Sequence, residues 1–278
     1  MPHFDTPEPI SVTLEFDMGS ARIIASKRAD TVVEVLPTND AEDIDVRAAQ
    51  QTKVTCSEGK LLIKGPKKRS LFGKSGSVEV SIELPAGSDL RGSSPMADFT
   101  CEGRFGDCRI KTSLGDILID EAAAVDLRTS LGTVRVDRVT GDAEVVGAGR
   151  IDIDVIGGAA TVKNANGETV IGEVTGELKA NSSNGRISVD IAHAGVDARS
   201  ANGGIRIGDA ARGQMVLQAA AGDIEIGIHE SSAAWLDVRT DVGSVRNSLG
   251  AAEGPGDSDE TVEVRARAGV GDIIVRRP

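Results

Sequence analysis

The sequence predicts an all-β protein: a β-solenoid of about nine coils over residues 105–278, preceded by an N-terminal β region over residues 1–104 and continuous with it. Three observations support this fold class. A glycine recurs at a near-constant interval, Ile and Val stand at fixed offsets from it, and aromatic residues make up only 2% of the 278 residues. Stacked coils enclose a thin interior that Ile and Val fill, whereas large rings do not fit there.

The recurring unit is a short polar segment, a glycine and then two alternating aliphatic residues, as in Thr112–Ile119 and Ser182–Val189. The interval to the next glycine is 17 residues after Gly115, 21 after Gly222 and 28 after Gly243, with values of about 18 between. A fixed period of this kind is typical of stacked repeats. The glycines that mark the units are Gly115, Gly132, Gly149, Gly167, Gly185, Gly203, Gly222, Gly243 and Gly271.

Aliphatic residues keep their distance from each glycine. Alternation with a period of two places one face of a β-strand inward, so each coil is predicted to hold two short strands. Two and four positions after the glycine stand Ile117/Ile119, Val134/Val136, Ile151/Ile153, Ile187/Val189, Ile205/Ile207, Ile224/Ile226 and Ile273/Val275. Seven and five positions before it stand Cys108/Ile110, Val125/Leu127, Ala160/Val162, Val196/Ala198, Met215/Leu217, Leu236/Val238 and Val264/Ala266.

The turns between the strands are built from glycine, and three successive units read Asn-Gly at residues 166–167, 184–185 and 202–203. Asn and Gly tolerate the positive φ that a tight corner requires. Three units are imperfect: Thr169 and Asn247 occupy inward offsets, and the strand before Gly149 is shifted by one residue. An acidic loop over Gly250–Glu260 explains the longest interval.

Two arrangements of these strands compete. In a solenoid each coil lies on the one before it, and neighbouring coils supply the burial that a single coil lacks. In an antiparallel meander the Asn-Gly pairs form hairpins instead. The near-constant period and the fixed offsets favour the solenoid.

The first part of the chain has a different composition. All five Phe and all three Cys precede residue 109, and no proline occurs between Pro95 and Pro255. No segment shows the long, capped pattern of a long helix. Short aliphatic or β-branched segments predict strands over Ser11–Phe16, Arg22–Ser26, Thr31–Leu36, Leu61–Lys64 and Ser77–Leu84, the last ending at Pro85-Ala86-Gly87.

The segment Val78–Gly87, followed by the Ser/Thr-x-Leu-Gly units from Thr112, resembles a bacterial family of putative adhesins with unknown function, also called β-strand-repeat proteins. The basic segment Lys67–Gly76 resembles actinobacterial members. The resemblance covers nearly the whole chain and implies a right-handed β-solenoid (β-helix) that follows an N-terminal β region.

Composition and charge narrow the function classes. A net charge of −12 argues against non-specific nucleic-acid binding. His3, His193 and His229 lie far apart, no catalytic or phosphate-binding motif is present, and no cofactor or metal ligand set is predicted. Cys56, Cys101 and Cys108 are an odd number, which suits buried free thiols, although Cys101 and Cys108 could meet across strands. With no apparent signal peptide or membrane span, we expect a cytoplasmic protein, with peripheral association with the envelope as an alternative.

Two sets of positive charges are candidate binding sites. One is an outward row four positions before the glycine, formed by Lys111, Arg128, Lys163, Arg199, Arg239 and Arg267. This row could bind an anionic polymer, or it could pair with neighbouring acids such as Asp126, Asp197 and Asp237. The pair Asp152 and Asp154 is expected to be a solvated face, and Trp235 to be buried or at an edge.

The second set lies in the segment 67–74, which carries four positive charges around two apolar residues. Basic residues around an exposed apolar pair are typical of a surface that engages anionic lipid or an acidic partner. The alternative is a loop whose apolar residues fold back onto the N-terminal sheet. The candidate partner-binding residues are Lys67, Lys68, Arg69, Leu71, Phe72 and Lys74.

The sequence therefore favours a non-enzymatic scaffold or interaction protein whose partner is another protein or an anionic surface. A carbohydrate-active β-helix enzyme is the first alternative, although the chain offers few aromatic residues to stack on sugars. A sensor associated with the envelope is the second.

Overall fold

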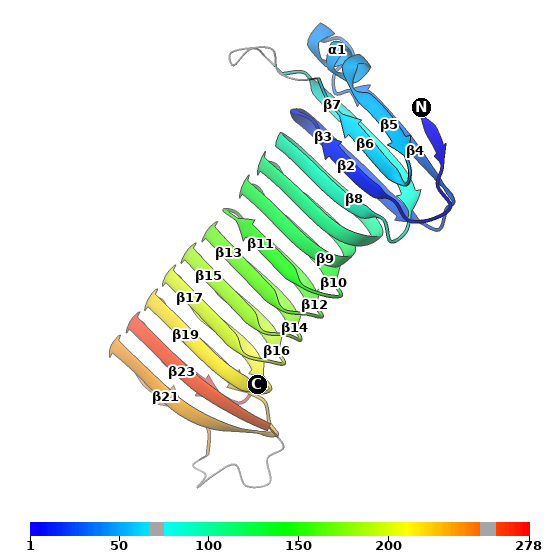
Figure 1. Ribbon diagram of the computed structural model, residues 1–278. Helices are drawn as coiled ribbons and strands as arrows, with labels where there is room; N and C mark the ends of the chain where they lie inside the picture. The colour runs from blue at the N-terminus through cyan, green and yellow to red at the C-terminus, as the bar shows by residue number, and fades with distance from the viewer. Residues whose placement is uncertain (67–74, 251–259) are drawn as a thin grey trace. The chain divides into compact units, whose positions relative to one another are not determined.

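The computed structural model describes residues 1–66, 75–250 and 260–278. The chain forms two compact units, Met1–Arg138 and Val139–Pro278. Both units are built mainly from parallel strands stacked coil on coil (Figure 1), so the chain is a β-solenoid, as the repeat predicts, and the antiparallel meander is excluded. The predicted boundary at residue 104 falls within one long strand of the first unit and stays a prediction.

The second unit consists of two parallel ladders, one for each strand of the coil. In order of pairing, the first ladder contains β11 (Ala143–Gly147), β13 (Ala160–Asn166), β15 (Leu178–Asn184), β17 (Val196–Asn202), β19 (Gly213–Ala221), β23 (Glu260–Val270) and β21 (Ser232–Val242). The second contains β12 (Ile151–Ile156), β14 (Thr169–Val174), β16 (Ile187–Ala192), β18 (Ile205–Ala210), β20 (Ile224–Ile228), β24 (Ile273–Arg276) and β22 (Val245–Asn247).

The first unit begins with antiparallel strands and continues as parallel coils. One ladder runs through β1 (His3–Asp5), β4 (Asp30–Pro37), β7 (Ser77–Pro85), β3 (Met18–Ser26), β8 (Asp89–Leu114) and β9 (Ile117–Leu131). The other runs through β5 (Lys53–Ser57), β6 (Lys60–Lys64), β2 (Ser11–Glu15) and again β8. The strand β10 (Val134–Val139) follows at the border with the second unit.

Like residues stack on like in the core, because the parallel register places equal offsets opposite each other. Ile187 pairs with Ile205 and Ile205 with Ile224, and all three side chains are at most 1% exposed. Thr169 takes an inward place in this row, and its Oγ1 accepts a hydrogen bond from Asn164 Nδ2 at 3.1 Å. The predicted inward pattern is thereby confirmed, and its polar exception has a partner inside the core.

The order of the coils departs from the order of the sequence at two places. In the second unit the last coil, β23 with β24, lies between the coil β19–β20 and the coil β21–β22. In the first unit the first coil, β2 with β3, lies between the coil β6–β7 and β8. The expectation that each coil lies on the preceding one is therefore wrong there. The acidic loop predicted over Gly250–Glu260 in the longest glycine interval lies almost wholly outside the described residues.

One short helix and two strands have no counterpart in the sequence prediction. The helix α1 (Asp43–Gln51) contacts β4 and β7, and its N-cap residue Glu42 makes no capping hydrogen bond with its side chain. It lacks the start signal by which helices are recognised. Its buried Asp45 instead accepts a hydrogen bond from the backbone N–H of Ser77 at 2.8 Å. The missed strands are β1 and β5.

The corner glycines stack as closely as the strands do. Gly185 has a φ of +140°, and a Cβ there would lie 2.0 Å from the carbonyl oxygen of Gly167 in the next coil. Beside it, the amides of Asn166, Asn184 and Asn202 form a ladder in which each Nδ2 donates to the preceding Oδ1 at 3.0 Å. Gly149 does not have a positive φ, which is consistent with the one-residue shift of the strand before it.

Replacing Gly185 by Ala is expected to lower the free energy of unfolding by about 2 kcal/mol or more, through the positive φ and the contact with the neighbouring carbonyl. Urea denaturation followed by circular dichroism measures this change. Gly250→Ala is the matched control, because a Cβ at Gly250 meets no atom within 4 Å. Equal denaturation midpoints for the two variants would contradict this account of the corner.

The three cysteines differ in access to reagents. Cys101 and Cys108 are free and 1% exposed, whereas Cys56 is free and half-buried. Burial raises the pKa of the Cys108 thiol to about 12 and that of Cys101 well above its usual range. The structure thus confirms buried free thiols for Cys101 and Cys108, with no disulfide between them, whereas Cys56 is only partly buried.

We expect a thiol-specific disulfide reagent at pH 8 to label Cys56 well before the other two cysteines, since the thiolate is the reactive form. Mass spectrometry of peptides gives the labelling of each residue over time. In denaturant, all three should react at similar rates. Rapid labelling of Cys108 in the folded protein would show that the coil around it opens.

Candidate binding groove

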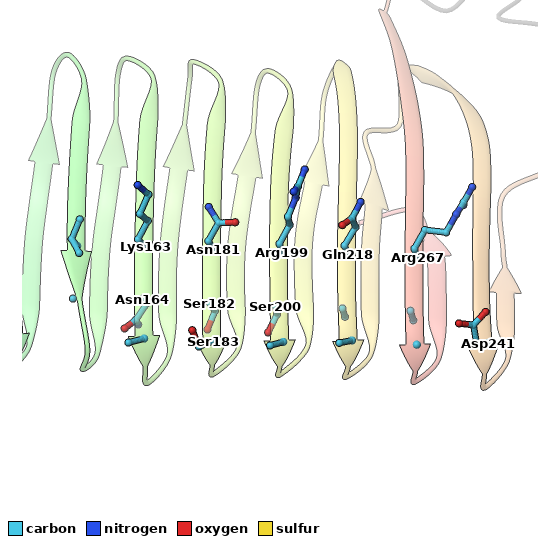
Figure 2. Close-up of a pocket in the computed structure, with 18 of the residues that line it drawn as sticks. Lys163, Asn164, Asn181, Ser182, Ser183, Arg199, Ser200, Gln218, Asp241 and Arg267 are labelled. Atoms are coloured by element: carbon cyan, nitrogen blue, oxygen red, sulfur yellow. The ribbon is translucent and has the colours of Figure 1, made fainter.

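A groove with a volume of about 930 Å³ crosses the second unit on one face of the first ladder. Residues at equivalent offsets of successive strands line it, so it runs across the coils (Figure 2). Strands β13, β15, β17, β19 and β23 supply most of the lining, and Val146 and Gly147 of β11 lie at one end.

One wall of the groove is a row of long polar side chains, here called the polar row: Lys163, Asn181, Arg199, Gln218 and Arg267. Register places each of them opposite the next, from Lys163 with Asn181 through to Gln218 with Arg267. Figure 2 shows these side chains on neighbouring strands of the ladder. Positive charges and neutral amides therefore alternate along the wall.

The floor of the groove consists of small residues two positions further along each strand, namely Ala165, Ser183, Ala201, Ala220 and Gly269. Between wall and floor, the buried hydroxyls of Ser182 and Ser200 donate hydrogen bonds to the carbonyl oxygen of Gly185, at 3.0 and 3.4 Å. Asn164 donates to the carbonyl of Gly149 at 2.9 Å, while its own Oδ1 is buried and accepts no hydrogen bond from a described residue. The small floor is what makes this face concave.

The cations of the groove are only partly neutralised. Arg199 pairs with Asp197 at 3.1 Å and Arg267 with Asp237 at 2.5 Å, while Lys163 makes no ion pair with a described residue. The guanidinium side chains of Arg199 and Arg267 remain 53% and 44% exposed. Exposed ion pairs of this kind contribute little to stability, so both arginines can exchange their partners for a ligand at small cost.

The predicted basic row divides between the two units. In the first unit Lys111 stands opposite Arg128, which pairs with Asp126 at 3.0 Å. In the second unit Lys163, Arg199 and Arg267 lie along the groove, and Arg239 of β21 lies at its end, 3.6 Å from Asp241. The predicted pairing with Asp126, Asp197 and Asp237 is confirmed for all three acids.

The other candidate residues are scattered or lie outside the described part. Lys67, Lys68, Arg69, Leu71, Phe72 and Lys74 fall within residues 67–74, outside the described residues. His3 lies on β1, and His193 and His229 follow β16 and β20; each lies 2.8 Å from one carboxylate, that of Asp30, Glu173 and Asp209 respectively.

Asp152 is paired with Arg150, and Trp235 lies on the outermost strand, 60% exposed. Among the described residues no group of three His, Cys, Asp or Glu could hold a metal ion. Nor is any helix in the described ranges long and apolar enough to cross a membrane, and the cytoplasmic location stays a prediction.

Sequence reasoning about charge missed half of the groove. Asn181 and Gln218 carry no charge, and the floor is visible only as small residues that recur two positions before the glycine.

A second missed feature is a ladder of aspartates after the corner glycines. The Oδ1 atoms of Asp116, Asp223 and Asp272 accept backbone N–H groups of Thr133, Asp272 and Ser244 in the adjacent coil, at 2.6 to 2.8 Å.

The family model described as Toastrack DUF4097 matches residues 13–276 of this chain. The chain belongs to the Toastrack DUF4097 family. The family resemblance expected from the repeat units is confirmed. No curated protein matches the sequence of this Toastrack chain.

Several solved structures are similar to this Toastrack chain. A putative adhesin from Bacteroides fragilis is 13% identical, with 99% of this chain and 95% of that chain covered and a TM-score of 0.39. A putative lipid binding protein from Parabacteroides distasonis is 12% identical, with 100% and 96% covered and a TM-score of 0.43. A putative adhesin from Parabacteroides merdae is 9% identical, with 100% and 95% covered and a TM-score of 0.42.

The pair Asp237 and Arg267 gives a prediction for the groove's edge. A hydrogen bond from Arg267 lowers the pKa of Asp237 below its usual 3.8. The carboxylate is therefore favoured in the folded state, and the stability it adds is present at neutral pH and lost as the pH falls through the lowered pKa. In Arg267→Gln we expect the pKa of Asp237 to return toward 3.8, measured by carboxyl NMR titration. Asp272, whose pKa is lowered mainly by Ser244, is the internal control and should not change.

Proposed function

We propose that this protein is a non-enzymatic interaction module that binds an extended acidic segment of a partner protein along the groove of the second unit. The observation that carries the proposal is the polar row above a floor of small residues, repeated on successive strands. The floor gives access to a chain-like ligand, and the row supplies cations and amides at regular intervals.

The spacing of the cations favours one ligand conformation. Lys163, Arg199 and Arg267 stand on alternate strands of the ladder, and strands about 4.8 Å apart put them about 10 Å apart along the groove. A polyproline II helix has three residues per turn and rises about 3.1 Å per residue, so each of its faces repeats every ~9.3 Å. A carboxylate at every third residue therefore meets one cation after another.

The amides between the cations fit the backbone of such a ligand. A polyproline II segment makes no internal hydrogen bonds, so its carbonyl groups are free to accept them from a protein. Asn181 and Gln218 stand between successive cations and carry amide donors. Aromatic side chains, on which sugars usually stack, are absent from the described lining, which favours a peptide over a polysaccharide.

The test uses a fluorescein-labelled peptide of Glu-Pro-Pro triplets and measures its anisotropy with the full chain at low salt. Lys163→Glu and Arg199→Glu are each expected to weaken binding about tenfold, because each removes a charge-assisted contact and adds a repulsion. Lys179→Glu is the matched control: it makes the same charge change on the same ladder, and Lys179 does not line the groove. It should bind the peptide nearly as wild type does.

Three outcomes would contradict the proposal. Lys179→Glu losing as much affinity as Arg199→Glu would show general electrostatic attraction. A peptide of equal composition with its glutamates in one block binding equally well would remove the argument from spacing. An anionic polysaccharide that binds more tightly than the peptide would show that the ligand belongs to another class. Cleavage of that polysaccharide, with release of new reducing ends, would show that the protein is an enzyme.

A further inference from the structure

The coil β21–β22 ends the stack of the second unit, and its end is open. Both strands pair on one side only, β21 with β23 and β22 with β24, and no strand of the described residues pairs with their other edges. Val245 points inward by its offset but is 42% exposed, whereas its neighbour Ile273 is fully buried. Leu236 and Val238 are half-buried, whereas Val264 opposite Leu236 is fully buried.

Apolar side chains are exposed on the outermost strand as well. Trp235 is 60% and Val242 62% exposed. A long unpaired strand beside an open apolar core is a template for further pairing, and repeat proteins ordinarily close such an end with a polar cap. Asn247 is the one polar residue that β22 places at an inward offset.

We propose that a second copy of this chain covers this end, with β21 of one copy pairing antiparallel with β21 of the other about a two-fold axis at Val238. This register overlaps residues 234 to 242 of both strands. In this register the inward-facing side chains of one copy lie beside the inward-facing side chains of the other, because side chains alternate between the two faces of a strand. The two open cores then join into one.

The charges of β21 select this register. A centre at Val238 puts Asp237 of each copy opposite Arg239 of the other, so both outward pairs are attractive. If the two-fold axis lay at Asp237, the Asp237 side chains of the two copies would lie directly opposite each other, and an axis at Arg239 would do the same for the two Arg239 side chains. Like charges directly opposite each other are destabilising. The side chains are accessible for this pairing, since Arg239 is 75% exposed and Asp237 42% exposed. Such a two-fold contact closes on itself and leaves no edge of β21 open.

Trp235 reports on the contact. In this register its ring lies diagonally across from Arg239 of the second copy, within reach of a cation–π contact. It is the one tryptophan of the chain, so intrinsic fluorescence follows this end of the protein alone. Association is expected to shift its emission to shorter wavelength as the protein concentration rises.

The experiment exchanges the two charges. Light scattering after gel filtration of the full chain should give the mass of a dimer. Asp237→Arg and Arg239→Asp should each weaken self-association about tenfold or more, because each change acts twice across a two-fold axis. An equimolar mixture of the two variants should again form dimers, since Asp237→Arg places two arginines opposite the two aspartates of Arg239→Asp.

The controls separate assembly from folding and from groove binding. Lys179→Glu changes a charge away from β21 and should remain a dimer, and circular dichroism should be the same for all variants. A wild-type chain that is monomeric at all concentrations would overturn the proposal. So would a mixture of variants that stays monomeric. These measurements of mass and circular dichroism do not depend on peptide binding at Lys163 and Arg199. The proposed dimer and the proposed peptide binding can therefore fail independently of each other.

Discussion

The parallel, in-register hydrogen bonding between coils is the constraint on which the rest of the structure depends. Each inner coil bonds to a coil on both sides through the same offsets, so every offset becomes a row of stacked residues. The corners then leave no room for a side chain, as the 2.0 Å approach at Gly185 shows. The interior of the second unit is equally restricted and holds mainly Ile, Val, Leu and Ala in rows, whereas the first unit also buries Phe99 and Phe105, so the expectation that large rings do not fit is wrong there.

The same constraint creates the binding surface. Residues at one outward offset are repeated about every 4.8 Å along the ladder, so a few residue types form an extended, regular surface. Rows of identical charges would repel each other, and the polar row avoids this by placing Asn181 and Gln218 between cations. Where two arginines are neighbours, Arg267 and Arg239, each has its own carboxylate, Asp237 and Asp241.

The sequence predicts the local structure well because the register repeats it many times over. Glycine spacing and aliphatic offsets identify the strands and their inward faces, and all five strands expected in the first part of the chain are present. The order of the coils, in contrast, cannot be read from the sequence. The strands β21 and β23 have nearly the same alternation of apolar and polar residues, so either fits beside β19, and only the packing of whole coils decides between them. The helix α1 was missed because Glu42 gives no cap signal, and the groove was half missed because its floor is defined by small side chains rather than by charge.

The inserted coils have a consequence for the order in which the second unit can fold. Residues 260–278 form the inner coil β23–β24, so the position beside β19 has to stay open until these residues have been synthesised. The outer coil β21–β22 comes earlier in the chain and has no settled neighbour in that interval, which leaves its strand edges open to aggregation. Once the inner coil is inserted, both of its strands are hydrogen-bonded on two sides, whereas β21 and β22, which are made earlier, remain at the edge.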